Sequence, residues 1–152
     1  MKILLPVDGS PAALAAVQHA LVCTGAGLSA SFVLVNVQEP ASLYEVVVAH
    51  DSEALTQLRR EAGADLLAPA EALLDAAGAE FESEVAGGVP ATLLVELLEN
   101  YACDAVVMGA RGMSAPDEGG LGSVALALLQ HSPVPVTVVR LVDTEVDAPA
   151  DA

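Results

Sequence analysis

Apolar residues are distributed along this chain in two different patterns. Five runs rich in aliphatic and β-branched residues predict strands, at 2–8, 31–37, 80–86, 104–110 and 134–141. The segments between them carry apolar residues at helical spacing and predict helices, at 11–23, 51–79, 90–102 and 123–132. Runs such as DAVVMGA are apolar without alternation, which is typical of parallel strands covered on both faces. The pattern therefore predicts an α/β fold with an open parallel sheet and helices on both faces.

Serine and proline mark several boundaries of these predicted helices. Ser10 is predicted to cap the first helix, with Pro11 as its first residue. Pro90 is expected in the first turn of the third helical segment. Pro69 lies inside the long second segment, and we expect it to kink or divide that helix near Ala68.

The third predicted strand, EFESEVA, differs from the others because its apolar positions alternate with three glutamates. This alternation places it at an edge of the sheet. The length of 152 residues fits one domain, which we assign to 1–142. The remaining segment, 143–152, is small, acidic and contains proline, and is predicted to be a disordered tail.

Composition narrows the possible functions. Apolar residues make up 54% of the chain and aromatic residues only 3%, so the core must consist of Ala, Val and Leu. Twenty-one acidic residues against five basic ones give a formal charge of −16. Such a chain lacks the basic patch that nucleic acids and anionic membrane surfaces require. No run is long enough for a membrane span or a signal peptide, so a cytoplasmic location is expected.

Cysteine and histidine give no sign of a metal site or a disulfide. Cys23 and Cys103 are far apart and form no paired motif, so we interpret them as reduced core thiols. His19, His50 and His131 lie on three separate segments without ligand spacing, and no metal site is predicted.

Two turns compete for the ligand site at the carboxyl ends of the strands. They are PVDGSP, after the first strand, and GARGMSAPDEGGLGS, after the fourth. If those strands are neighbours, the two loops face each other across one crevice. Neither the P-loop pattern nor the G-x-G-x-x-G fingerprint is present. The amides of 122–125 begin a helix, however, and its unpaired N–H groups and dipole would form an anion site.

The glycine spacing here, Gly109-x2-Gly112-x9-Gly122-Ser123, resembles the nucleotide-binding signature of the universal stress protein family. The opening ILLPVDGSPAALAAV, the MGARG after the fourth strand and the ending SPVPVTVVR are similar to that family as well. The resemblance covers nearly the whole domain. It implies a Rossmann-like three-layer sandwich with strand order 3-2-1-4-5, and a homodimer formed through the last strand, 134–141.

The family's nucleotide ligand is ATP, with Mg²⁺ as a possible companion. The resemblance implies a site built from residues that follow the first, second and fourth strands or begin the last helix: Pro6, Val7, Asp8, Val37, Met108, Gly109, Gly112, Gly122, Ser123, Val124 and Ala125. Asp8 would face adenine or ribose, unless it is only a structural acid at the strand end. Arg111 either contacts the phosphates or is a solvated loop residue.

The chain departs from the family's pattern in three ways. Ala125 stands where Ser or Thr is common, which removes one hydroxyl directed at phosphate. The spacer contains Asp117 and Glu118, which either point to solvent or help to hold Mg²⁺. Val89 replaces an acidic or amide residue before Pro90, with an effect expected only on a helix cap.

The sequence thus predicts a dimeric, ATP-binding stress-response or regulatory protein. Any hydrolysis should be slow, because there is no P-loop lysine, arginine finger or evident catalytic base. The alternative is an interaction module of the same fold that does not depend on nucleotide. A hydrolase using Ser123 or Asp8 is a third, more remote interpretation.

Overall fold

A computed structural model describes residues 1–39, 52–111 and 120–141 of the chain. Its strands and helices follow each other in the order β1 (Lys2–Pro6), α1 (Pro11–Gly25), β2 (Ser31–Gln38), α3 (Ser52–Ala76), β3 (Phe81–Gly87), α4 (Pro90–Asn100), β4 (Ala105–Gly109), α5 (Ser123–His131) and β5 (Val136–Val139). Each of these elements was predicted from the sequence, with ends that differ by a few residues.

The strands form one parallel sheet in the order β3-β2-β1-β4-β5. Ile3 of β1 is in register with Phe32 of β2 on one side and with Ala105 of β4 on the other. This arrangement confirms the predicted topology and the edge position of β3. At the other edge lies β5, and β1 occupies the centre.

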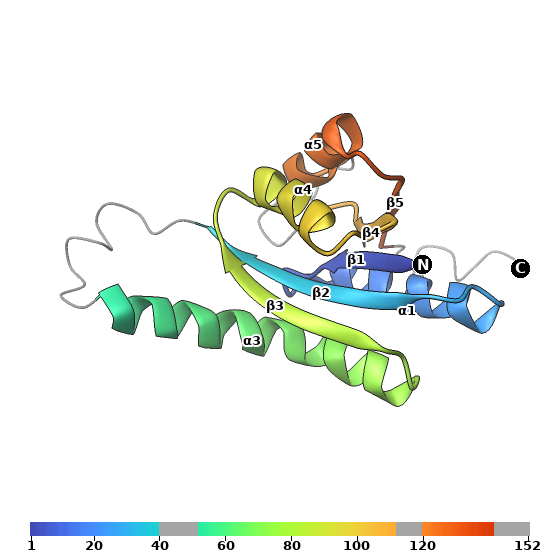
Figure 1. Cartoon of the computed structure of the whole chain (residues 1–152), viewed down its shortest axis with the longest axis horizontal. Helices are drawn as coiled ribbons and strands as arrows, with labels where there is room; N and C mark the ends of the chain where they lie inside the picture. Colours follow the sequence, from blue (N-terminus) through green and yellow to red (C-terminus); the bar gives the residue numbers. More distant parts are fainter. Residues whose placement is uncertain (40–51, 112–119, 142–152) are drawn as a thin grey trace, which may run out of the picture.

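Helices cover both faces of this sheet, α1 and α3 on one side and α4 and α5 on the other (Figure 1). Ile3 and Leu5 face the first pair, whereas Leu4 faces the second. Strands buried on both faces need no polar alternation, which explains the continuous apolar runs of the sequence. Phe32 is the one aromatic residue among the largest fully buried side chains of the described core, and the rest are Leu and Val.

Two helix starts agree with the sequence. Ser10 caps α1, because its Oγ accepts the N–H of Ala13 at 3.2 Å, and Pro11 follows in the first turn. Pro90 occupies the first turn of α4, and Val89 provides no side-chain hydrogen bond to that helix end. The departure at Val89 therefore leaves the helix without a side-chain cap, as expected.

The expected division of the long helix at Pro69 is wrong. Helix α3 runs through Pro69 and Ala68 as one unbroken element (Figure 1). Proline has no N–H for the carbonyl of Asp65, but both residues are exposed, so water can satisfy that carbonyl. Leu67 and Leu74 are buried in the core and hold the two halves of the helix on the same face of the sheet.

The two cysteines are free thiols, and only one belongs to the core. Cys103 is buried with α4 and β4, and this burial raises the pKa of its thiol. Cys23 is half-buried, because it lies at the border of the stripe of α1 that packs on the sheet. Its interpretation as a core thiol is therefore wrong. The predicted tail, 143–152, lies outside the described residues.

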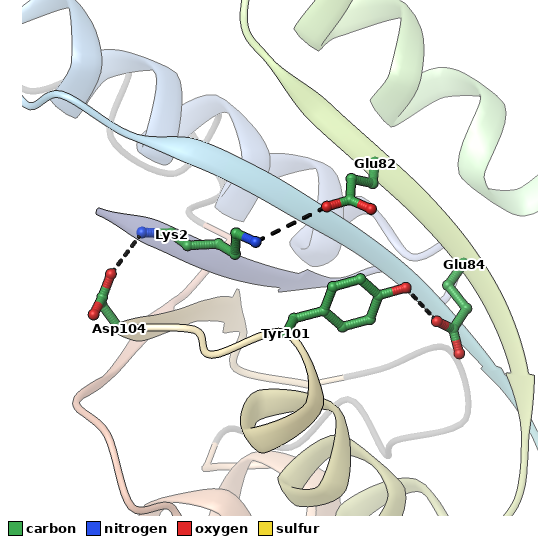
Figure 2. A network of polar contacts seen from close by, with 5 residues as sticks. All are labelled: Lys2, Glu82, Glu84, Tyr101 and Asp104. Carbon is green, nitrogen blue, oxygen red and sulfur yellow. Dashed lines mark hydrogen bonds and ion pairs between the residues drawn. The ribbon is translucent and has the colours of Figure 1, made fainter.

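Polar contacts join β1 and β3 to the segment between α4 and β4 (Figure 2). The Lys2 N–H donates to Asp104 Oδ2 at 2.8 Å, and Lys2 Nζ lies 4.0 Å from Glu82 Oε2. The hydroxyl of Tyr101, just after α4, donates to Glu84 Oε1 on β3. This hydrogen bond, together with burial and the charges of Glu84 and Glu82, raises the pKa of Tyr101 from 10.0 to about 12. The network fastens the edge strand to the rest of the domain.

The Tyr101–Glu84 contact predicts a specific loss of stability in alkali. Tyr101 ionises more readily in the unfolded chain, so its contribution is complete below pH 10.0 and is lost as pH rises to about 12. Urea unfolding of the wild type and Tyr101→Phe should show a free-energy difference that shrinks across this range. Equal pH dependence of the two proteins would contradict the assignment.

Candidate functional site

A cavity of about 550 Å³ opens at the carboxyl ends of the central strands. The lining comes from the ends of β1, β2 and β4, the segments next to them, and the starts of α1, α4 and α5: Pro6, Val7, Asp8, Ser10, Ala13, Val35, Val37, Glu39, Pro90, Leu94, Met108, Gly109, Ala110, Arg111, Leu121, Gly122, Ser123, Val124 and Ala125. Because β1 lies between β2 and β4, the turns after the first and fourth strands meet at this cavity.

The predicted site residues are brought together by this topology. Of the twelve, every one except Gly112 lines the cavity, and Gly112 lies outside the described residues. The spacer residues Asp117 and Glu118 also lie outside them. A shared cavity establishes that these residues are neighbours, while their contacts with a ligand stay a prediction.

Several lining residues were missed by the sequence analysis. Pro90 and Leu94 come from α4, whose first turn was interpreted only in terms of capping. Glu39 lies two residues beyond Val37, just after β2, and adds a second carboxylate to the lining, in addition to that of Asp8. No sequence motif marks these positions. Pro90 and Leu94 line the cavity because of how α4 packs on the sheet, and Glu39 does so because β2 ends just before it.

Helix α5 begins at the cavity, with Gly122 as its N-cap. The first backbone hydrogen bond of the helix is the one that the Leu126 N–H donates to the Gly122 carbonyl, at 3.0 Å. The amides of Ser123, Val124 and Ala125 therefore have no acceptor within the helix. With the helix dipole, these three groups can bind an anion without a side-chain cation.

The expectation that Gly122 supplies a fourth unpaired amide is wrong. Its N–H donates to the Ala110 carbonyl at 2.7 Å, which ties the start of α5 to the end of β4. Ala125 is buried, and its methyl group packs in the core with Leu128 and Met108. The residue that lacks the family's hydroxyl therefore has a packing role in this chain.

Asp8 has a structural role in the turn after β1. Its Oδ1 accepts the N–H of Ser10 at 2.9 Å, and the intervening Gly9 adopts a φ of +88°. This hydrogen bond fixes the turn that leads into α1. The side chain is nevertheless exposed and lines the cavity, so its carboxylate and a sugar hydroxyl are chemically compatible partners.

Charged groups of both signs line the cavity. Asp8 and Glu39 are acidic, whereas Arg111 is basic and half-buried. Within residues 1–39, 52–111 and 120–141, no three His, Cys, Asp or Glu side chains group together as potential ligands of one metal ion. The site therefore combines apolar walls, carboxylates suited to hydroxyl groups, and backbone donors suited to an oxyanion.

Gly109 is needed for close packing between two elements of the fold. A Cβ at this position would lie 2.8 Å from the Ala12 carbonyl carbon and 3.0 Å from both the Cβ and the carbonyl oxygen of Ala12. The first glycine of the motif thus lets the start of α1 approach β4.

The family model that matches the chain is that of the universal stress protein family, over residues 1–140. Universal stress protein MJ0531 of Methanocaldococcus jannaschii is 29% identical over 139 residues, which cover 91% of this chain and 81% of the relative. No helix in the described part of the chain has the length and apolar character of a membrane span.

Solved structures show the same architecture. The structure of the hypothetical protein MJ0577 matches with a TM-score of 0.78 and 25% identity, covering 93% of this chain and 96% of that one. A universal stress protein crystallised in complex with cAMP matches with a TM-score of 0.64 and 25% identity, over 92% and 96% of the two chains.

The contact at Gly109 predicts a loss of stability that does not depend on any ligand. Gly109→Ala should lower the free energy of unfolding by about 1–3 kcal/mol, because the added methyl group overlaps the backbone of Ala12. Gly25→Ala is the matched control, since no atom lies within 4 Å of its added Cβ. Urea unfolding should separate the two variants, and equal stability would disprove the packing role.

Proposed function

The chain belongs to the universal stress protein family, and on this premise we propose that it binds ATP in the cavity between β1, β4 and α5. The observation that carries the proposal is the convergence of the first turn of α5, the carboxylate of Asp8 and the apolar wall of Val35 and Val37 on one cavity. The cAMP complex of a relative supports an adenine nucleotide as the ligand class.

The nucleoside is assigned to the part of the cavity formed by the strand ends. Val37 offers apolar surface to the purine, as do Pro6 and Met108 at the neighbouring strand ends, with Val35 buried behind them. The exposed carboxylate of Asp8, which also accepts the Ser10 N–H, accepts a hydrogen bond from a ribose hydroxyl. Such a site is mainly apolar with a few directed polar groups, as small-molecule sites usually are.

The phosphates are assigned to the start of α5. The amides of Ser123, Val124 and Ala125 bind phosphate oxygens, the Ser123 hydroxyl adds a donor, and Arg111 lines the same cavity. Hydrogen bonds to charged groups contribute about 1.5–3 kcal/mol each. Exposed charges are screened over about 8 Å at physiological salt. A few local donors therefore outweigh the diffuse repulsion from a net charge of −16.

Bound nucleotide would act mainly on stability and assembly, in a regulatory or stress-response role. We assign no catalytic residue, and we expect hydrolysis to be slow at most. In-line attack on a phosphate needs a positioned base or metal and a charge-stabilising cation. Mg²⁺ would enter with the triphosphate, since the described residues provide no three-carboxylate group for it.

One set of observations favours a second candidate, an interaction module that does not depend on nucleotide. The Gly122 amide is already paired with Ala110, and Ala125 provides no hydroxyl. Asp8 and Glu39 also add negative charge to the cavity. These features weaken a phosphate site, and the two candidates differ in whether ATP changes the stability of the protein.

We expect Mg-ATP at millimolar concentration to raise the Tm of the purified protein, because a ligand that binds only the folded state stabilises it. Gly122→Val should abolish this shift, because its side chain crowds the first-turn amides of α5. Gly87→Val is the matched control, since that glycine lies outside the cavity and the atom nearest to an added Cβ is the Gln38 carbonyl oxygen, at 3.8 Å.

Differential scanning fluorimetry and titration calorimetry with ATP, ADP, AMP and cAMP provide the measurement. An absent shift with all four nucleotides would favour the nucleotide-independent module. Equal shifts in the wild type and in Gly122→Val would place the ligand elsewhere.

We further propose a homodimer formed through the β5 edge, 134–141. This strand ends the sheet and leaves one side of its backbone unpaired within the sheet. Leu141 follows the strand and is 59% exposed, and Leu126 and Leu129 of α5 are also exposed. A second copy would cover both the strand edge and these apolar side chains.

Leu141→Glu should therefore shift the protein from dimer to monomer in light scattering, because it buries a charge in the proposed interface. Leu58→Glu on α3 is the matched control, as Leu58 is similarly exposed at 62% but lies on another part of the domain. A dimer that survives Leu141→Glu, or a wild type that is monomeric, would refute this interface.

A further inference from the structure

His19 and Cys23 form a pair of metal-ligating side chains on α1, outside the cavity. Their spacing of four residues places them on the same side of the helix, and the Cys23 Sγ lies 3.6 Å from the His19 Nε2. His19 is exposed and Cys23 is half-buried, so both donor atoms lie near solvent. No spacing among the histidines alone, or between the cysteines alone, marks this mixed pair in the sequence.

The separation of the two donor atoms matches a metal chelate. Zinc binds thiolate sulfur at about 2.3 Å and imidazole nitrogen at about 2.0–2.1 Å, and a tetrahedral angle between them places the donors about 3.6 Å apart. The contact measured here is 3.6 Å, so an ion could bridge the pair without moving the helix backbone. Two ligands four residues apart on one helix face are also the arrangement used by helical zinc motifs.

We propose that His19 and Cys23 together form a binding site for Zn²⁺ or a cation of similar softness. The thiolate and the imidazole fill two positions, and water or donors from a second molecule fill the others. No third His, Cys, Asp or Glu of the described residues joins the pair, so the site is open. Binding displaces the Cys23 thiol proton to solvent, and the new metal–sulfur and metal–nitrogen bonds replace the contact between the two side chains.

Thiolate and imidazole are softer metal ligands than carboxylate, which distinguishes this pair from the many acidic residues of the chain. The 21 acidic residues attract any divalent cation to the surface, but thiolate and imidazole favour zinc over magnesium or calcium. The second thiol does not compete, because Cys103 is buried and its burial raises its pKa. Excess Mg²⁺ should therefore occupy the carboxylates and leave the pair available.

Co²⁺ is a suitable probe, because a thiolate bound to this ion gives a charge-transfer band, and the chain has no Trp to obscure the ultraviolet region. The reduced, full-length protein is titrated with Co²⁺ in excess Mg²⁺, and Zn²⁺ is then added in competition. We expect the band in the wild type and its disappearance when Zn²⁺ is added. Both Cys23→Ser and His19→Ala should lack the band.

His131→Ala is the matched control, since His131 is also exposed, in the last turn of α5. This variant should keep the full band. Circular dichroism establishes whether each variant is folded. If Cys23→Ser does not fold, the result for His19→Ala, which changes an exposed residue, tests the proposal. The proposal is overturned if the wild type gives no band, if His19→Ala keeps it, or if His131→Ala loses it.

Discussion

The close approach of α1 to the sheet is the constraint on which the rest of the structure depends. Gly109 leaves room for the backbone of Ala12, and the small side chains of Ala13, Ala16 and Ala20 continue this contact along the helix. A core almost without aromatic rings has no large side chain to fill gaps, so its density must come from such approaches. The Ser10–Asp8 hydrogen bond fixes the turn between β1 and α1, and the pairing of β1 with β4 places that turn beside the end of β4.

The cavity is a consequence of strand order. Because β1 lies between β2 and β4, three strand ends form one wall, and the starts of α4 and α5 form the other. The Gly122 amide is used to hold α5 on Ala110, and the next three amides are left for an anion. One end of a helix thus both anchors the fold and supplies the chemistry that we propose for the site.

Charge has different effects at different distances in this molecule. The net charge of −16 opposes polyanionic partners that need an extended basic surface, whereas the few directed amides of the site that we propose act on a compact anion at short range. On the edge strand β3, glutamates disfavour pairing of its outer edge with a strand of another chain. Glu84 also accepts the hydrogen bond of the Tyr101 hydroxyl.

The sequence by itself determined the strands, the order of elements, the Ser10 cap and, through its resemblance to a family, the strand order and eleven of the residues that line the cavity. The strands, their order along the chain and the cap follow from local periodicity and capping chemistry, which need no knowledge of distant contacts. The strand order within the sheet and the site residues came only through the resemblance. Only the tertiary structure decided that α3 continues through Pro69 and that the Gly122 amide is paired. It also decided that Glu39 and Leu94 line the cavity, and that Cys23 is only half-buried. Each of these depends on which groups packing exposes to water or brings into contact, and a one-dimensional pattern does not specify that.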